Sequence, residues 1–354
     1  MIGNVFEWYD IMVYSAFTPI ITKHFFPHVS ELAGLIATFG VFGVGYLARP
    51  LGGTLLGIYG DRGGRVKSIT LAIAAMAICS GGIGLLPTYA TIGAFAPLLL
   101  LLLRIIQGMS LGGEYAGAIT IVGEHAPQGK RGFYLSLLSM ATSLGQVLGV
   151  VVSLGMIGIF GEQLVSDWLW RFAFLLGAGI GIVGFYLRRR VQESNEFASL
   201  QHSGHLSDSP LRESVQRSRL PLLTAGITVL AVTMVAKYLA LTYIPSYLQT
   251  SGGNSMNTGL SFSLAYMITI IILIPLCGLL SDHIGIKKVT LFSVFSLSVL
   301  SVPIFIMLSS QSKIIIIGAG VLYGVLACGS NATWPNILAN LFPSRVRFRP
   351  RSAS

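Results

Sequence analysis

Long apolar runs alternate with short polar joints along the chain. Each run has about 20 residues and, at about 1.5 Å of helical rise per residue, is long enough to cross the hydrocarbon core of a bilayer. We place ten runs at residues 2–23, 32–56, 68–87, 95–122, 133–160, 169–188, 220–248, 258–280, 288–309 and 313–342. Because lipid satisfies no backbone hydrogen bonds, such runs must be helices. The pattern therefore predicts an all-α polytopic membrane protein.

Basic residues are distributed unevenly between the polar joints. Seventeen Lys and Arg residues fall in the joints on one side of the predicted membrane, whereas the joints on the other side hold only Lys23 and Lys313. Such an excess marks the cytoplasmic side. It predicts that both chain ends and the long joint 188–219 are cytoplasmic.

Composition agrees with a membrane protein. Of the 354 residues, 53% are hydrophobic and only 10% are charged, unlike a typical soluble domain. The net charge of +10 would suit nucleic acid, but a nucleic-acid site needs basic residues gathered on one soluble surface. We therefore expect the lipid bilayer as a partner, and no nucleic acid.

The sequence offers little support for enzymatic chemistry. The His, Cys, Asp and Glu residues show no metal-ligand spacing, and no nucleophile and base arrangement stands out. Cys79, Cys277 and Cys328 fall inside apolar runs without paired spacing, so we interpret them as small core residues. We expect no enzyme activity, no metal and no cofactor.

The long polar joint separates six runs from four. The stretches GIYGDRGGRVK (57–67) and GLLSDHIGIKK (278–288), one on either side of it, align at a fixed offset of 221 residues. A repeat of this size predicts duplicated helical bundles, as in secondary transporters. We assign 1–187 to an N-terminal six-helix bundle, 188–219 to a cytoplasmic linker, 220–342 to a partial C-terminal bundle of four helices, and 343–354 to a basic cytoplasmic tail.

The first copy of this repeat resembles a known motif. Its pattern of Gly, three residues, Asp, Arg, one residue, Gly and Arg occupies Gly57, Asp61, Arg62, Gly64 and Arg65. It is similar to the signature loop between helices two and three of the major facilitator superfamily. The resemblance implies a cytoplasmic latch, in which glycine allows close helix approach and the ionic residues exchange partners as the bundles rock. The alternative is a tight basic turn.

The second copy of the repeat keeps only part of the motif. It retains Gly278, Asp282 and Gly285 but has His283 and Ile286 where the first copy has arginines. The second copy supports the latch interpretation. Its sequence leaves open whether it also makes the ionic contacts of the motif.

Further segments resemble one branch of that superfamily. They are GNVFEWYDIMVY (3–14), RPLGGTLLGIYGDRGGR (49–65), RIIQGMSLGGEYAGA (104–118), EHAPQGKRGFYLS (124–136), DWLWRFAF (167–174) and LTYIPSYL (241–248). In this order they resemble the metabolite:proton symporter family, which contains proline/betaine, 2-oxoglutarate, citrate and shikimate transporters. The resemblance implies a major facilitator fold in a bacterial inner membrane. The family typically has twelve helices, so the chain resembles a C-terminally truncated member.

The first run carries two carboxylates on one face. At about 100° per residue, Glu7, Asp10 and Tyr14 fall within a roughly 60° arc. A carboxylate in an apolar medium is costly unless it is paired or protonated, and a proton-coupled carrier needs such a group. We predict Asp10 and Glu7 as proton-coupling residues. For Glu7 the alternative is a place in the cytoplasmic interface near Met1.

The fourth run also has a polar face. Arg104, Gln107 and Glu114 fall within about 80° of one another, and charges inside a membrane usually point into the helix bundle. In the family that the chain resembles, this helix lines the central cavity. We predict Glu114 as a further proton-coupling residue, and Arg104 and Gln107 as substrate-binding residues. The alternative for Arg104 is a structural salt bridge.

Three side chains of the later runs, together with Tyr14, complete the predicted substrate site. Lys237 lies near the middle of the seventh run. We expect it to hold a substrate carboxylate or to neutralise a carboxylate across the cavity; the alternative is a lysine that extends along the helix to an interface. Tyr238 binds a quaternary ammonium group by a cation–π contact or belongs to an interfacial belt. Asn331 lines the cavity or bonds neighbouring helices.

These observations predict proton symport of a small polar metabolite by alternating access. The segment LTYIPSYL slightly favours proline or glycine betaine as the substrate. Lys237 together with Arg104 would also suit 2-oxoglutarate or citrate. A competing hypothesis is a truncated chain that no longer transports, or a membrane protein with an interaction role. Another is a uniporter or sensor without proton coupling.

Overall fold

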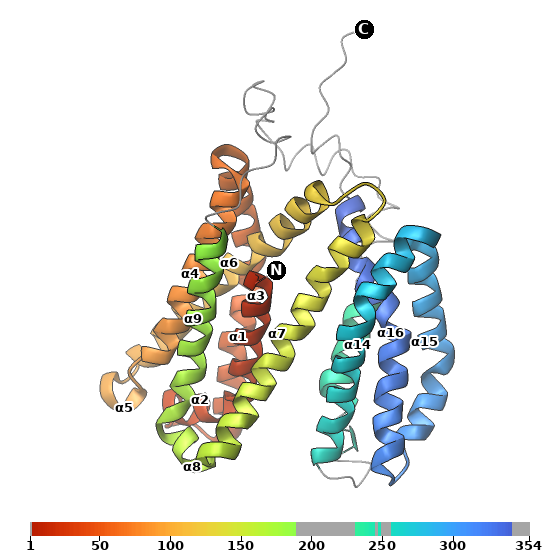
Figure 1. The fold of residues 1–354 in the computed structure, drawn as a ribbon. Helices are drawn as coiled ribbons and strands as arrows, with labels where there is room; N and C mark the ends of the chain where they lie inside the picture. Colours follow the sequence, from red (N-terminus) through yellow and green to blue (C-terminus); the bar gives the residue numbers. More distant parts are fainter. Residues whose placement is uncertain (1, 189–230, 245–246, 249–255, 342–354) are drawn as a thin grey trace. The chain divides into compact units, whose positions relative to one another are not determined.

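The computed structural model describes residues 2–188, 231–244, 247–248 and 256–341. Its contacts divide the chain into two compact units (Figure 1). Unit 1 comprises Met1–Ala118 and Leu144–Ala198, and unit 2 comprises Ile119–Ser143 and Ser199–Ser354. The predicted linker 188–219 falls almost entirely outside the described residues, so the predicted domain boundaries stay a prediction.

All regular elements in the described residues are helices. Unit 1 contains α1 (Ile2–Ala16), α2 (Thr18–Phe25), α3 (Glu31–Gly63), α4 (Arg65–Leu85), α5 (Tyr89–Ile92), most of α6 (Phe95–His125), the later part of α7 (Arg131–Phe160), α8 (Glu162–Leu164), the π-helix η1 (Val165–Leu169) and α9 (Trp170–Arg188). Unit 2 contains the end of α6, the beginning of α7, a helix at Ala231–Leu241, the π-helix η2 (Leu239–Tyr243), α14 (Met256–Ile284), α15 (Ile286–Leu308) and α16 (Lys313–Leu341).

Eight described helices are long and apolar enough to cross a membrane. The first predicted run forms two helices, because α1 ends at Ala16 and α2 starts anew with a proline in its first turn. The seventh run is described only in part, as the shorter apolar helix Ala231–Leu241. The predicted all-α polytopic fold is confirmed.

Aromatic side chains of α1 and α9 fill the centre of unit 1. Phe6, Tyr9, Trp170 and Phe174 are buried in one cluster. Tyr9 donates a hydrogen bond to the carbonyl oxygen of Ala173 over 2.7 Å, which satisfies its hydroxyl in this apolar surrounding. Helix α1 is thereby fixed against α9, and its polar face is held inside the unit.

Helices α3 and α6 approach closely at glycines. A Cβ atom placed on Gly108 would overlap the carbonyl oxygen of Gly45, and one on Gly112 would overlap that of Arg49. Small residues permit this backbone contact between membrane helices. The contact fixes the turn of α6 that carries Arg104, one turn before Gly108.

In unit 2, α14 and α16 pack side by side, and α15 packs on α16 (Figure 1). Tyr323 of α16 donates a hydrogen bond to the carbonyl oxygen of Ala236 over 2.8 Å. This bond ties the helix Ala231–Leu241, which carries Lys237, to α16.

Candidate functional site

A buried ion pair lies at the centre of unit 1. Nη1 of Arg104 in α6 lies 3.0 Å from Oδ2 of Asp10 in α1. Gln107 donates from Nε2 to the same oxygen over 3.2 Å, and the Ser80 hydroxyl of α4 donates to Oδ1 over 2.5 Å. All four residues are at least 95% buried. Because both carboxylate oxygens accept hydrogen bonds from charged or polar donors, the cost of burying Asp10 is offset.

Arg104 is held on a second side by an aromatic ring. Its guanidinium carbon lies 3.8 Å from the centre of the Tyr14 ring, a cation–π arrangement. The Tyr14 hydroxyl in turn donates to the carbonyl oxygen of Thr38 over 3.1 Å. The predicted residues Asp10, Tyr14, Arg104 and Gln107 therefore form one cluster.

This cluster has unused hydrogen-bonding atoms. Nε and Nη2 of Arg104 and Oε1 of Gln107 are buried and have no hydrogen-bond partner among the described residues. Leaving such groups unsatisfied costs about 1–3 kcal/mol each, and more for charged groups. The arrangement can supply two guanidinium donors and one amide acceptor to a small polar ligand.

Glu7 makes a separate ion pair one turn away. Its Oε1 lies 3.5 Å from Nη2 of Arg49 in α3, whose guanidinium carbon lies 3.9 Å from the centre of the Tyr46 ring. Glu7 is only 2% exposed. Two arginines from two helices therefore face the two carboxylates of α1.

Sequence reasoning missed Ser80 and Arg49 as members of these pairs. Arg49 had a usable signal, since it is a charged residue inside an apolar run and pairs with an acid elsewhere. Ser80 had none, because serines are common in the apolar runs and only the fold brings this one to Asp10.

Three other predicted residues belong to unit 2. Lys237 and Asn331 are buried, and Asn331 donates to the carbonyl oxygen of Ala327 in its own helix over 2.9 Å. Tyr238 is 49% exposed. The π-helix η2 begins two residues after Lys237, and such bulges are frequent at functional sites.

The predicted latch is described in part. Gly64 and Gly285, which correspond in the repeat, both adopt positive φ, at 109° and 96°, where other residues would be strained. Gly57 is exposed. The side chains of Asp61, Arg62 and Arg65, and that of Glu114, lie outside the described residues.

Asp282 in the second copy caps the start of α7. Its Oδ1 accepts a hydrogen bond from the backbone nitrogen of Gly132 over 2.6 Å, and Oδ2 accepts one from Phe133 over 2.9 Å. A carboxylate at a helix N-terminus satisfies free N–H groups and opposes the positive end of the helix dipole. Gly278 packs against Ser136 and the Gly132 carbonyl oxygen, which gives α14 close access to α7.

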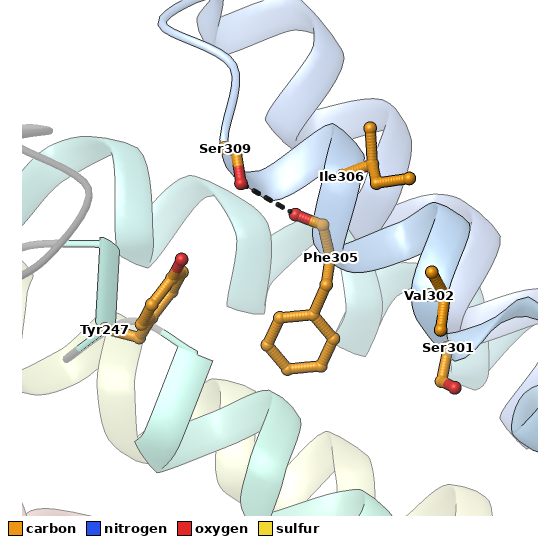
Figure 2. A pocket seen from close by; sticks show the side chains of 6 residues that line it. All are labelled: Tyr247, Ser301, Val302, Phe305, Ile306 and Ser309. Carbon is orange, nitrogen blue, oxygen red and sulfur yellow. Dashed lines mark hydrogen bonds between the residues drawn. The ribbon is translucent and has the colours of Figure 1, made fainter.

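A hollow of about 370 Å³ in unit 2 does not coincide with these residues. Figure 2 shows that it lies between Tyr247 and one side of α15; the lining residues are Tyr247, Ser301, Val302, Phe305, Ile306 and Ser309. None of them is charged, and none is a predicted site residue. Among the described residues, no group of three His, Cys, Asp or Glu side chains could hold a metal ion.

Comparisons with known proteins identify relatives over the whole chain. The chain is 35% identical to the "Proline/betaine transporter" of Escherichia coli (strain K12), covering 100% of this chain and 72% of that protein. It is also 35% identical to the "Glycine betaine/proline/ectoine/pipecolic acid transporter OusA" of Dickeya dadantii (strain 3937), covering 98% and 71% of the two chains.

Solved structures show the same fold. The proton:xylose symporter XylE bound to 6-bromo-6-deoxy-D-glucose superposes with a TM-score of 0.75 at 17% identity, covering 98% of this chain and 81% of that one. The family model described as Major Facilitator Superfamily matches residues 1–348. The chain therefore belongs to the major facilitator superfamily, as its motifs indicated, and is a multi-pass membrane transporter rather than an enzyme.

Proposed function

We propose that the chain is a proton symporter that takes up proline or glycine betaine across a bacterial inner membrane. The names of the relatives give the substrate class. The observation that carries the coupling is the buried pair of Asp10 and Arg104, with guanidinium nitrogens of Arg104 left unused. Membrane charges of this kind mark proton and substrate pathways in transporters.

Coupling follows from one cation shared between two anions. While Asp10 is ionised, it holds Arg104 and competes with any substrate carboxylate. When Asp10 binds a proton, the charge of Arg104 becomes available, and the substrate carboxylate binds it as a charge-assisted pair. Proton and substrate then load together, and an inward proton supplies about 2.3 kcal/mol per 100 mV of membrane potential.

Gln107 offers a means of separating the two substrates. Its unused Oε1 accepts a hydrogen bond, and proline has N–H groups to donate, whereas the quaternary nitrogen of glycine betaine has none. In unit 2, Lys237 and Asn331 are assigned to substrate binding, with Tyr238 as a further candidate. Glu7 and Glu114 are further candidates for proton coupling.

The glycine-rich repeat is assigned to a latch on the cytoplasmic side. The cap that Asp282 forms on α7 supports this role, because it is a polar contact between two helices made by a residue of the repeat. The excess of basic residues supports a cytoplasmic location for the latch and for both chain ends.

Uptake by cells tests the proposal. Labelled proline, glycine betaine, 2-oxoglutarate and citrate would be offered to transporter-deficient bacteria that express this chain, with and without a protonophore. We expect uptake of proline or betaine that the protonophore abolishes. Uptake that withstands the protonophore would indicate a uniporter, and uptake of the dicarboxylate or tricarboxylate alone would reverse the substrate assignment. No uptake, with the chain confirmed in the membrane, would contradict transport itself.

A further inference from the structure

Two of the three cysteines meet inside unit 2. The Sγ atoms of Cys277 in α14 and Cys328 in α16 lie 2.9 Å apart, and both residues are free thiols. Cys328 is buried, whereas Cys277 is partly exposed. Cys79 is a buried free thiol of α4 in unit 1. The prediction that all three are only small core residues is therefore incomplete, because it missed this contact.

Close packing of two long helices holds the thiols together. A Cβ atom placed on Gly320 of α16 would lie 2.6 Å from the carbonyl oxygen of Phe262, and one on Gly324 would lie 2.8 Å from Cβ of Thr269. Such glycines let the helix axes approach. The thiol of Cys328 also donates to the carbonyl oxygen of Val325 over 2.9 Å. The contact between the sulfurs is thus set by helix packing.

We propose that Cys277 and Cys328 are a redox modification site, which a hydroperoxide converts into an intramolecular disulfide. The thiolate of the more exposed Cys277 attacks one peroxide oxygen, the O–O bond breaks, and one water leaves after protonation. Cys328 then attacks Sγ of the resulting sulfenic acid, the S–O bond breaks, and a second water leaves. Two thiols lose two electrons and two protons, and hydrogen peroxide is reduced to two molecules of water.

The disulfide would affect a neighbouring contact in the same unit. Cys277 directly precedes Gly278, which packs against Gly132 and Ser136 of α7, and Asp282 caps that helix. A disulfide would tie α14 to α16 one residue before Gly278, so α14 could move away from α7 only together with α16. Oxidation is therefore expected to slow transport, a consequence that rests on the proposed function.

Counting thiols tests the modification without any transport assay. Membranes containing the full chain would be treated with hydrogen peroxide, denatured and labelled with a maleimide that adds a visible mass. We expect the labelled thiols to fall from three to one and to return to three after a dithiol reductant. Cys79→Ser should fall from two to none, whereas Cys277→Ser and Cys328→Ser should each keep two. A digest should contain the peptides of Cys277 and Cys328 joined.

Other results would overturn the proposal. Three labelled thiols after oxidation, a loss that the reductant does not reverse, or an equal loss in Cys277→Ser would each contradict the pairing. Uptake should fall in the oxidised parent and persist in Cys328→Ser. Pairing without a change in uptake would refute the regulatory part alone. Absent uptake in the untreated chain would contradict the proposed transport function, and the thiol count would be unaffected.

Discussion

Arg104 lies between Asp10 and the ring of Tyr14, with one guanidinium nitrogen 3.0 Å from the carboxylate and the guanidinium carbon 3.8 Å from the ring centre. The ring and the carboxylate hold the cation in place, yet two of its nitrogens have no hydrogen-bond partner among the described residues. An arginine of this kind can change partners without leaving its position. The proposed coupling depends on this property.

Ser80→Ala should weaken transport. The hydroxyl donates to Oδ1 of Asp10 over 2.5 Å, and a hydrogen bond to a charged group contributes about 1.5–3 kcal/mol. We expect uptake to fall roughly tenfold or more, since about 1.4 kcal/mol corresponds to a factor of ten. Ser153→Ala is the matched control, because that buried serine has no hydrogen-bond partner among the described residues. Equal uptake rates in the two variants would show that the hydrogen bond from Ser80 to Asp10 does not contribute to transport.

Gly108→Ala should prevent correct folding. The added Cβ would overlap the backbone of Gly45, and overpacking costs about 1–3 kcal/mol or more where the backbone must move. We expect a large loss of folded protein, measured as the monodisperse fraction in size-exclusion chromatography after detergent extraction. The control is Gly155→Ala in α7, which has nothing within 4 Å of the added atom and should match the parent. A normal yield of Gly108→Ala would contradict the contact between α3 and α6.

Asp282→Ala should lower thermal stability. It removes the acceptor of two backbone hydrogen bonds at the start of α7, and loss of a helix cap costs about 0.5–2 kcal/mol. Asp282→Asn should cost less, because one oxygen remains to accept a bond. Thermal unfolding in detergent would show the order parent, Asn variant, Ala variant, while the exposed Asp167→Ala in η1 should leave the unfolding temperature unchanged. An unchanged temperature for Asp282→Ala would mean that the cap contributes nothing.

Lys237→Met should impair substrate binding. Methionine keeps an unbranched side chain at this buried position but removes the ammonium charge. If Lys237 binds the substrate carboxylate, the variant loses a hydrogen bond between charged groups, which contributes about 1.5–3 kcal/mol. KM for proline should therefore rise about tenfold or more. The exposed Lys313→Met is the control. A KM equal to that of the parent would assign Lys237 to structure alone.

The sequence predicted four members of the central cluster, but not Ser80, because helix periodicity is local. Asp10 and Tyr14 share a face of one helix, and Arg104 and Gln107 share a face of another, so their angular positions follow from spacing alone. The high cost of charge inside a membrane then implied a partner for each of the two charged residues, and the structure pairs Asp10 with Arg104.

The missed contacts depend on packing between distant helices. Ser80 reaches Asp10 across 70 positions, and Cys277 meets Cys328 across 51. Helix periodicity cannot predict contacts between residues so far apart in the sequence. Such contacts depend on which helices are neighbours and on how closely glycines let them approach. The role of Asp282 was also hidden, because its partners are backbone nitrogens that carry no signature in the residue types.

The most direct test of the central claim is proton movement with Asp10→Asn. Energy-depleted cells or vesicles expressing the chain would be placed in weakly buffered medium, and the external pH would be followed after proline or glycine betaine is added. Proton symport predicts alkalinisation by the parent chain. It predicts none with Asp10→Asn, although that variant should still exchange labelled substrate across the membrane. Equal alkalinisation by the variant and the parent would contradict the assignment of the proton to Asp10.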